Sequence, residues 1–250
     1  MLSSLDLGAG EALFAAGVLF LAAYVRGYSG FGFSAVLVAG MTFIVEPLAA
    51  VPLAIAFEVV ASMVQGRSVW HEIRWPDFWV LLAAAVVGNP IGVWILTTVD
   101  PDVLRGITLV VLLLLSVGML VGHEGTIVPT TTAFFVVGTV AGVVNGATAL
   151  SGLVLVLAMT FMVISPGEMR ATLVAYFFAS DLVVLGILWA RDEITDELIW
   201  RVIAGLPLLA IGIAVGSRAF RGSSPESFRR NTLGLLVAIS VVGLIGLWIG

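Results

Sequence analysis

The stretch RGYSGFGFS, which begins at Arg26, places a charge, hydroxyl groups and glycines between two apolar runs. A guanidinium group carries a fixed positive charge and a planar fork of donors that suits a small oxyanion. Ser29 and Ser34 add neutral hydroxyl donors, while Gly30 and Gly32 let backbone N–H groups approach a ligand closely. These residue types therefore predict a binding site for a negatively charged molecule.

A second polar stretch, NGATALSG, also separates two apolar runs. Its candidate ligand-binding residues are Asn145, Thr148, Ser151 and Gly152. Where a helix resumes after such a break, its first turn presents free N–H groups and the positive end of its dipole, which favour an anion. The chain contains no cysteine, which excludes thiolate metal sites, and we expect neither a metal nor a cofactor.

The composition predicts that these two stretches lie within a membrane protein. Of the 250 residues, 60% are hydrophobic and only 11% are charged, whereas soluble domains carry roughly 25% charged residues. A membrane-spanning helix needs about 20 apolar residues, and most of the chain consists of apolar runs joined by short polar connections. We therefore expect an all-α polytopic membrane protein. The apolar segments are 12–25, 31–45, 47–66, 77–98, 103–121, 132–144, 150–164, 168–190, 198–219 and 231–249.

Matching motifs indicate an internal duplication, with halves at residues 1–122 and 123–250. VLVAGMTFIVEP, which ends at Pro47, is similar to VLVLAMTFMVISP, which ends at Pro166. Each half would hold three full transmembrane helices and one short broken helix pair, either a re-entrant hairpin or a discontinuous helix. Because the number of segments in each half is odd, the two repeats must have inverted topology.

Four segments are too short to cross the bilayer comfortably, namely 12–25, 31–45, 132–144 and 150–164. As helices they would reach only about 20 to 23 Å, whereas the hydrocarbon core is about 30 Å thick. They form one adjacent pair in each half, and each pair is joined by one of the polar stretches. Interrupted pairs at corresponding positions of inverted halves indicate the central site of a transporter. We therefore expect the two breaks to meet near the bilayer midplane, with alternating access as one half rocks against the other.

Two acids, Glu58 and Asp181, lie inside apolar runs at nearby positions of the two halves. A charged residue within a membrane segment is costly, so a functional role is the default interpretation. Each acid could pair with Arg26 or take up a proton that is coupled to transport, and the sequence leaves both roles open. Arg26 itself could instead reach the membrane interface if segment 12–25 crosses the bilayer.

These motifs together resemble the sulfite exporter TauE/SafE family of membrane transporters. The resemblance lies in a glycine-rich break followed by an apolar run and a proline, present as GYSGFGFSAVLVAGMTFIVEP and GVVNGATALSGLVLVLAMTFMVISP. It extends through GNPIG...DPDVLR and GIAVG...SPESFR, although NGATALSG holds fewer glycines than is usual in the family. The resemblance implies outward movement of a small sulfur-containing anion, such as sulfite or a short organosulfonate like sulfoacetate. Each negative charge that leaves a cell gains about 2.3 kcal/mol per 100 mV of inside-negative potential, so export needs no coupling ion.

The arginine distribution predicts the orientation, because cytoplasmic loops carry an excess of basic residues. We expect the protein in the cell inner (cytoplasmic) membrane, with its arginine-rich face on the cytoplasmic side. Both termini would then lie outside. We expect a small anionic substrate and the lipid bilayer as partners, no nucleic acid, and a homodimer as the candidate assembly. The arginines of the expected cytoplasmic face are Arg67, Arg74, Arg170, Arg218, Arg221, Arg229 and Arg230.

Three alternative functions fit parts of the sequence. GYSG matches the G-x-S-G serine motif of rhomboid intramembrane proteases, but a serine nucleophile needs a nearby base. His71 and His123 both lie outside the apolar segments, so we expect Ser29 to have no base and the protein not to be an enzyme. A second alternative is an accessory membrane protein without transport activity. A third retains transport but couples the anion to a proton.

Overall fold

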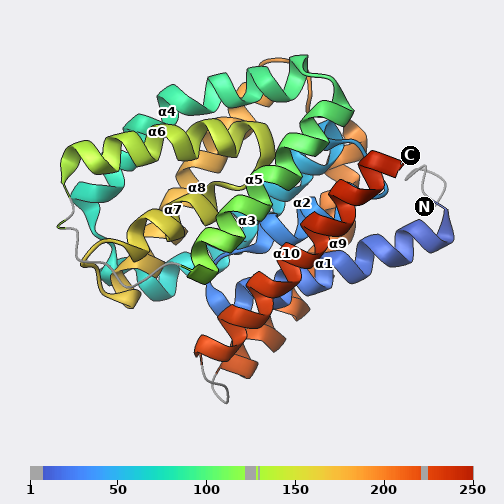
Figure 1. Cartoon of the computed structure of the whole chain (residues 1–250). Helices are drawn as coiled ribbons and strands as arrows, with labels where there is room; N and C mark the ends of the chain where they lie inside the picture. The colour runs from blue at the N-terminus through green and yellow to red at the C-terminus, as the bar shows by residue number, and fades with distance from the viewer. Residues whose placement is uncertain (1–7, 122–127, 129, 221–224, 250) are drawn as a thin grey trace.

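The computed structural model of the protein describes residues 8–121, 128, 130–220 and 225–249, and this part of the chain is built of helices (Figure 1). The predicted all-α polytopic membrane fold is confirmed. His123, where the second repeat was expected to begin, lies outside the described residues. The helices are α1 (Ala9–Ser29), α2 (Phe33–Met41), α3 (Pro47–Val69), the 3-10 helix η2 (Trp70–Glu72), α4 (Trp75–Thr98), α5 (Pro101–Val121), α6 (Thr131–Thr148), α7 (Ser151–Thr160), α8 (Pro166–Trp189), α9 (Asp196–Phe220) and α10 (Pro225–Ile249).

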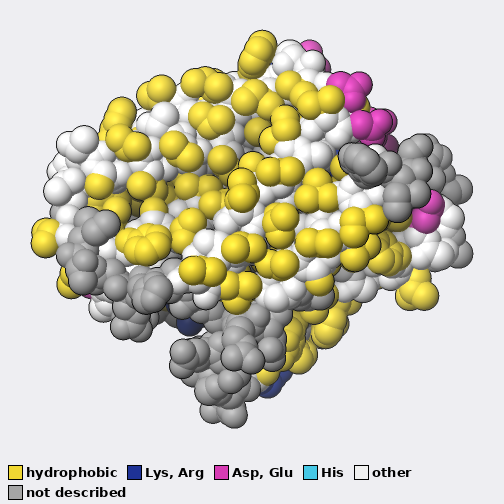
Figure 2. Space-filling view, in the orientation of Figure 1, with side chains coloured by type: hydrophobic (Ala, Val, Ile, Leu, Met, Phe, Trp, Pro, Cys, Tyr) yellow, Lys and Arg dark blue, Asp and Glu magenta, His cyan; other side chains and the backbone are white. Residues whose placement is uncertain are grey.

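Helix length and surface composition suit a bilayer. In the described residues, seven helices are long and apolar enough to cross a membrane: α1, α3, α4, α5, α6, α8 and α9. Large apolar side chains point outward from several of them, as Trp94 on α4 and Leu114 on α5 do. Figure 2 shows one face largely covered by hydrophobic side chains, with acidic side chains gathered at its upper right edge and basic ones below. The protein is therefore a multi-pass membrane protein.

Two of the four segments predicted to be short are long helices. Segment 12–25 belongs to α1, which has 21 residues, and segment 132–144 belongs to α6, which has 18 residues. Both helices continue through the polar residues that were expected to interrupt them, because those side chains bond to α3 and α8 instead of disrupting the backbone. Only α2 and α7 are short, with 9 and 10 residues. Each broken pair thus joins one long helix to one short helix.

The chain leaves α1 and α6 through residues with a left-handed backbone. Gly30 ends α1 with φ of 80°, and Ala149 ends α6 with φ of 58°. The N–H of Gly30 donates to the carbonyl of Arg26, and the N–H of Ala149 donates to the carbonyl of Asn145, each at 2.8 Å. The two breaks therefore have the same local geometry, and Arg26 and Asn145 occupy equivalent places in it.

Helix contacts follow the same pattern in both halves of the chain. Helix α4 packs along α6 and α1 packs along α9, while α3 contacts α8 and α5 contacts α10 (Figure 1). If α1–α5 correspond in order to α6–α10, then α4 corresponds to α9 and α6 corresponds to α1. The α4–α6 contact and the α9–α1 contact are then equivalent. The contacts are those that a repeat of five helices would give, and both the repeat and its residue boundaries stay a prediction.

Glycines bring α4 against α6 and α1 against α9 at backbone distance. A β-carbon on Gly92 of α4 would overlap the carbonyl oxygen of Val143 on α6. The equivalent Gly216 of α9 would overlap the carbonyl oxygen of Tyr24 on α1. Small residues permit such close helix packing within membranes. The matching GNPIG and GIAVG motifs therefore have a packing role, and these two seams hold the ends of α1 and α6 in place.

Replacement of Gly92 should test this packing. Gly92→Ala should destabilise the protein by about 1 to 3 kcal/mol, because α4 and α6 must separate to admit the methyl group. Thermal unfolding of the detergent-solubilised variant would measure the loss. Gly186→Ala on α8 is the matched control, since a β-carbon there meets nothing within 4 Å. Equal stability of the two variants would contradict a tight seam.

Candidate functional site

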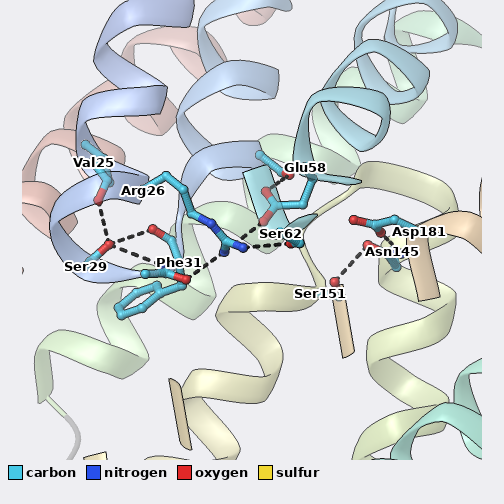
Figure 3. Close-up of polar contacts among 11 residues, drawn as sticks. Val25, Arg26, Ser29, Phe31, Glu58, Ser62, Asn145, Ser151 and Asp181 are labelled. Atoms are coloured by element: carbon cyan, nitrogen blue, oxygen red, sulfur yellow. Dashed lines mark hydrogen bonds and ion pairs between the residues drawn. The ribbon is translucent and has the colours of Figure 1, made fainter. Parts of the chain in front are cut away.

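Arg26 lies at the centre of the protein with a side chain that is 0% exposed. Its Nη1 atom is 2.8 Å from Glu58 Oε1 and donates to the carbonyl oxygen of Gly30 at 2.6 Å (Figure 3). Its Nη2 atom donates to Ser62 Oγ at 2.9 Å. The guanidinium carbon also lies 5.0 Å from the centre of the Phe177 ring. Arg26 is therefore paired with an acid, which was one of the two predicted roles for Glu58.

Four helices position this ion pair. Arg26 comes from the last turn of α1, Glu58 and Ser62 from one face of α3, and Phe177 from α8. Ser34, in the first turn of α2, donates to Glu58 Oε2 at 2.9 Å. Both carboxylate oxygens are thus bound, one by the arginine and one by a hydroxyl. The pair ties the end of α1 and the start of α2 to the middle of α3.

Asn145 takes the equivalent place in the second half. Its Nδ2 atom donates to Asp181 Oδ1 at 2.8 Å, and its Oδ1 atom accepts from Ser151 Oγ at 2.8 Å (Figure 3). Ser180, next to the acid on α8, accepts from Asn89 Nδ2 of α4 at 3.1 Å. A basic partner within ion-pair distance of Asp181 is absent from the described part of the chain. The second half-site is therefore a hydrogen-bonded acid without a counter-charge.

The two half-sites meet at a small cavity between the breaks. Glu58 and Ser34 line it from the first half, and Asn145, Ser151 and Asp181 line it from the second. Its volume is about 10 Å³, which is about the room that one water molecule requires. An oxyanion with three or four heavy atoms does not fit. A ligand of that size could therefore enter only if the cavity widened.

Most of the predicted site residues lie at this cavity, and two use their hydroxyl groups elsewhere. Ser29 Oγ contacts the carbonyl oxygens of Val25 and Phe31 at 2.8 and 2.6 Å. Thr148 Oγ1 donates to the carbonyl oxygen of Val144 at 2.8 Å. Ligand binding by these residues, as by the whole set, stays a prediction. The predicted residues that line the cavity are Gly32, Ser34, Glu58, Asn145, Ser151, Gly152 and Asp181.

Sequence reasoning missed several residues of the site. Ser62 and Ser180 belong to an Ala-Ser dipeptide that occurs once in each half, and this repetition was the available signal. Phe177 carried no signal, because a phenylalanine in an apolar helix is most often a packing residue. Arg170 was assigned only to the cytoplasmic face, yet its side chain lies against Gly30 at the first break. Helix packing, and not chain position, brings it there.

The protease interpretation finds no support in the geometry. The Ser29 hydroxyl is bonded to backbone carbonyl oxygens, and His71 lies in the exposed 3-10 helix η2. Within the described residues, no group of three His, Asp or Glu side chains could hold a metal ion.

The charge of the site also matters for an anion. The buried ionisable groups around the cavity are Arg26, Glu58 and Asp181, so their formal sum is one negative charge when both acids are ionised. Such a site would repel an anion, because the repulsion between charges of the same sign is screened only weakly in the protein interior. Anion binding therefore requires either a proton on one of the acids or a further positive charge.

A comparison with protein families places the chain. The model of the sulfite exporter TauE/SafE family matches residues 14–243, which span both breaks and both half-sites. The chain belongs to this family. Searches of curated proteins and of solved structures gave no match to this TauE/SafE protein. The predicted resemblance is confirmed, and with it the assignment to a family of membrane exporters.

Substitution of Arg26 should test the ion pair of this TauE/SafE protein. Arg26→Gln should cost about 3 to 5 kcal/mol of stability, because Glu58 would be left as an unpaired buried charge. The double variant Arg26→Gln with Glu58→Gln should regain most of that loss. Thermal unfolding in detergent would measure both.

Arg105→Gln provides the control for the loss of a surface pair. Arg105 lies 3.3 Å from the exposed Asp102, and exposed pairs contribute about 0 to 1 kcal/mol. A single Arg26 variant as stable as the wild type would show that the buried pair is not structural.

Proposed function

We propose that this TauE/SafE protein carries a small sulfur-containing anion, sulfite or a short organosulfonate, outward across the cytoplasmic membrane by alternating access. The observation that carries the proposal is the family match over residues 14–243. The paired helix breaks around Arg26 and Asn145 are the candidate for its midplane site, because interrupted helices in inverted repeats mark the binding sites of many transporters. We propose both termini outside and, as predicted, a homodimer as the candidate assembly.

The geometry supports a role for Arg26 in which Glu58 is exchanged for substrate. In the structure the acid occupies the guanidinium fork at 2.8 Å. An oxyanion that enters the widened cavity could take over one donor of the fork, while Ser34 continues to hold Glu58 through Oε2. The first turn of α2 has no side-chain cap at Gly32, so its N–H groups are available to a second oxygen. The glycine therefore leaves room for the ligand.

An anion panel tests the proposal on purified protein. Sulfite and short sulfonates should raise the melting temperature in detergent, since a ligand at 100 times its dissociation constant stabilises the native state by about 2.7 kcal/mol. Sulfate and thiosulfate serve as comparison anions. In proteoliposomes, an inside-negative potential should increase the efflux of the anion that gave the shift.

The Arg26→Gln, Glu58→Gln double variant is the matched control. It removes both charges and should fold, yet it should show neither the shift nor the efflux. A double variant that transports at the wild-type rate would exclude Arg26 from the site. A wild-type protein that responds to no anion in either assay would contradict the proposed function.

Asp181 favours a second candidate, in which transport is coupled to a proton. The acid is 2% exposed and no basic residue in the described chain pairs with it. The groups that face it are Glu58 and Ser34 across the cavity, Asn145 of α6 and Ser151 of α7. A proton on Asp181 would bring the formal charge of the site to zero and so permit an anion to bind. The anion and the proton would then move together.

The pH dependence of transport separates the two candidates. With coupling through Asp181, wild-type transport should rise as the pH falls, because the protonated acid is the form that admits the anion. Asp181→Asn, which is permanently neutral, should keep a high rate and lose this dependence. Initial rates in proteoliposomes at several pH values would measure it. A pH profile that is the same in both proteins favours uniport.

A further inference from the structure

Arg170 lies directly on the first helix break. It comes from the N-terminal part of α8, and a β-carbon on Gly30 would lie 2.7 Å from its Nε atom and 3.1 Å from its Cδ and Cγ atoms. The aliphatic stem and the start of the guanidinium group therefore lie along the backbone of Gly30. Gly30 has a φ of 80°, which glycine adopts readily because it has no β-carbon. The same lack of a β-carbon leaves room for the Arg170 side chain.

Arg170 has no acceptor among the residues that the structure describes. Its Nε atom is buried and makes no hydrogen bond. The Nε atoms of Arg26 and Arg105 are also buried without a hydrogen bond, but each of these two arginines lies within ion-pair distance of a carboxylate. A buried donor that lacks a partner costs free energy, so this N–H is a place where an oxyanion would bind favourably.

The charge of Arg170 acts on the central site. Its side chain lies against Gly30, whose carbonyl oxygen accepts from Arg26 Nη1 at 2.6 Å, so both arginines lie at the same helix break. Arg170 supplies the further positive charge that the central site lacks, since it would bring the formal sum of Arg26, Glu58 and Asp181 from one negative charge to zero. An anion next to Arg170 therefore meets a site that no longer repels it.

We propose that Arg170 and the Gly30–Gly32 turn form a second anion subsite, through which the substrate passes between the N-terminal end of α8 and the central cavity. The ligand class is a small oxyanion such as sulfite or a sulfonate, which can accept from Arg170 Nε and from the N–H groups of the first turn of α2, where Gly32 provides no side-chain cap. The subsite rests on the proposed function, because it serves the same substrate. The anion would first contact Arg170, and would then contact Arg26 once it reached the widened central cavity.

Affinity measurements on charge variants test this subsite. Arg170→Gln should weaken sulfite or sulfonate binding by about 10- to 100-fold, as expected for the loss of a charged hydrogen-bonding partner. Arg170→Lys keeps the charge without the fork and should lose less. Arg218→Gln is the control, because Arg218 is an exposed arginine of α9 and its loss should change affinity by less than about twofold.

A chemical rescue separates a role in charge from a role in packing. The chain contains no cysteine, so Arg170→Cys introduces a single thiol. A cationic aminoethyl thiosulfonate should restore anion binding to this variant, whereas an anionic sulfonatoethyl thiosulfonate of similar size should not. Equal rescue by both reagents would show that the side chain only fills space, and would overturn the subsite.

The measurements should be made in lipid-free non-ionic detergent and repeated with anionic phospholipid. If Arg170 binds a lipid phosphate instead of the free anion, Arg170→Gln will match the wild type without lipid, and the subsite is wrong. If the wild type binds an anion and Arg170→Gln binds it equally well, the subsite fails while the proposed function stands. If the wild type binds no anion of the panel, both fail.

Discussion

A guanidinium group buried within a membrane protein must be neutralised by an opposite charge and by hydrogen bonds, because each unpaired donor there carries a large desolvation cost. Arg26 meets this requirement at both terminal nitrogens, through Glu58, Ser62 and the carbonyl oxygen of Gly30, whereas its Nε atom makes no hydrogen bond. The partners come from two structural features: the acid and the hydroxyl from the middle of α3, and the carbonyl from the turn that ends α1. One electrostatic requirement thus fixes the position of the break, the end of a long helix and the wall of the cavity.

The second half-site uses the same backbone frame with different chemistry. Asn145 takes the place of Arg26, and Asp181 accepts a hydrogen bond from a neutral amide where Glu58 forms an ion pair with a cation. A structurally symmetric pair of breaks therefore has an asymmetric charge distribution. One side contains a neutral ion pair and the other an acid without a counter-charge, so the two sides respond differently to a proton or to an anion.

The sequence predicted the membrane fold, the two breaks and the residues that gather there, because glycine clusters and isolated charges are conspicuous in an apolar chain. It misplaced the helix ends, since periodicity does not reveal that the polar residues from Arg26 to Ser29 continue α1 when their side chains find partners. It also left the choice of partner for Arg26 open. Glu58 and Asp181 both lie in apolar runs of matching helices, and only the tertiary structure, which brings Glu58 of α3 within 2.8 Å of Arg26, decides between them. Arg170 was assigned to a membrane face for the related reason that its depth depends on how α8 lies against the break.

The glycine seams have a consequence for the way that this protein can move. Gly92 joins α4 of the first half to α6 of the second, and Gly216 joins α9 of the second half to α1 of the first. One helix of each half is therefore packed tightly against a helix of the other half at each seam. Backbones in direct contact separate only at a high cost, so each mixed pair, α1 with α9 and α4 with α6, should move as one body. If the protein works by alternating access, as we propose, the bodies that move would be these mixed pairs and not the two halves.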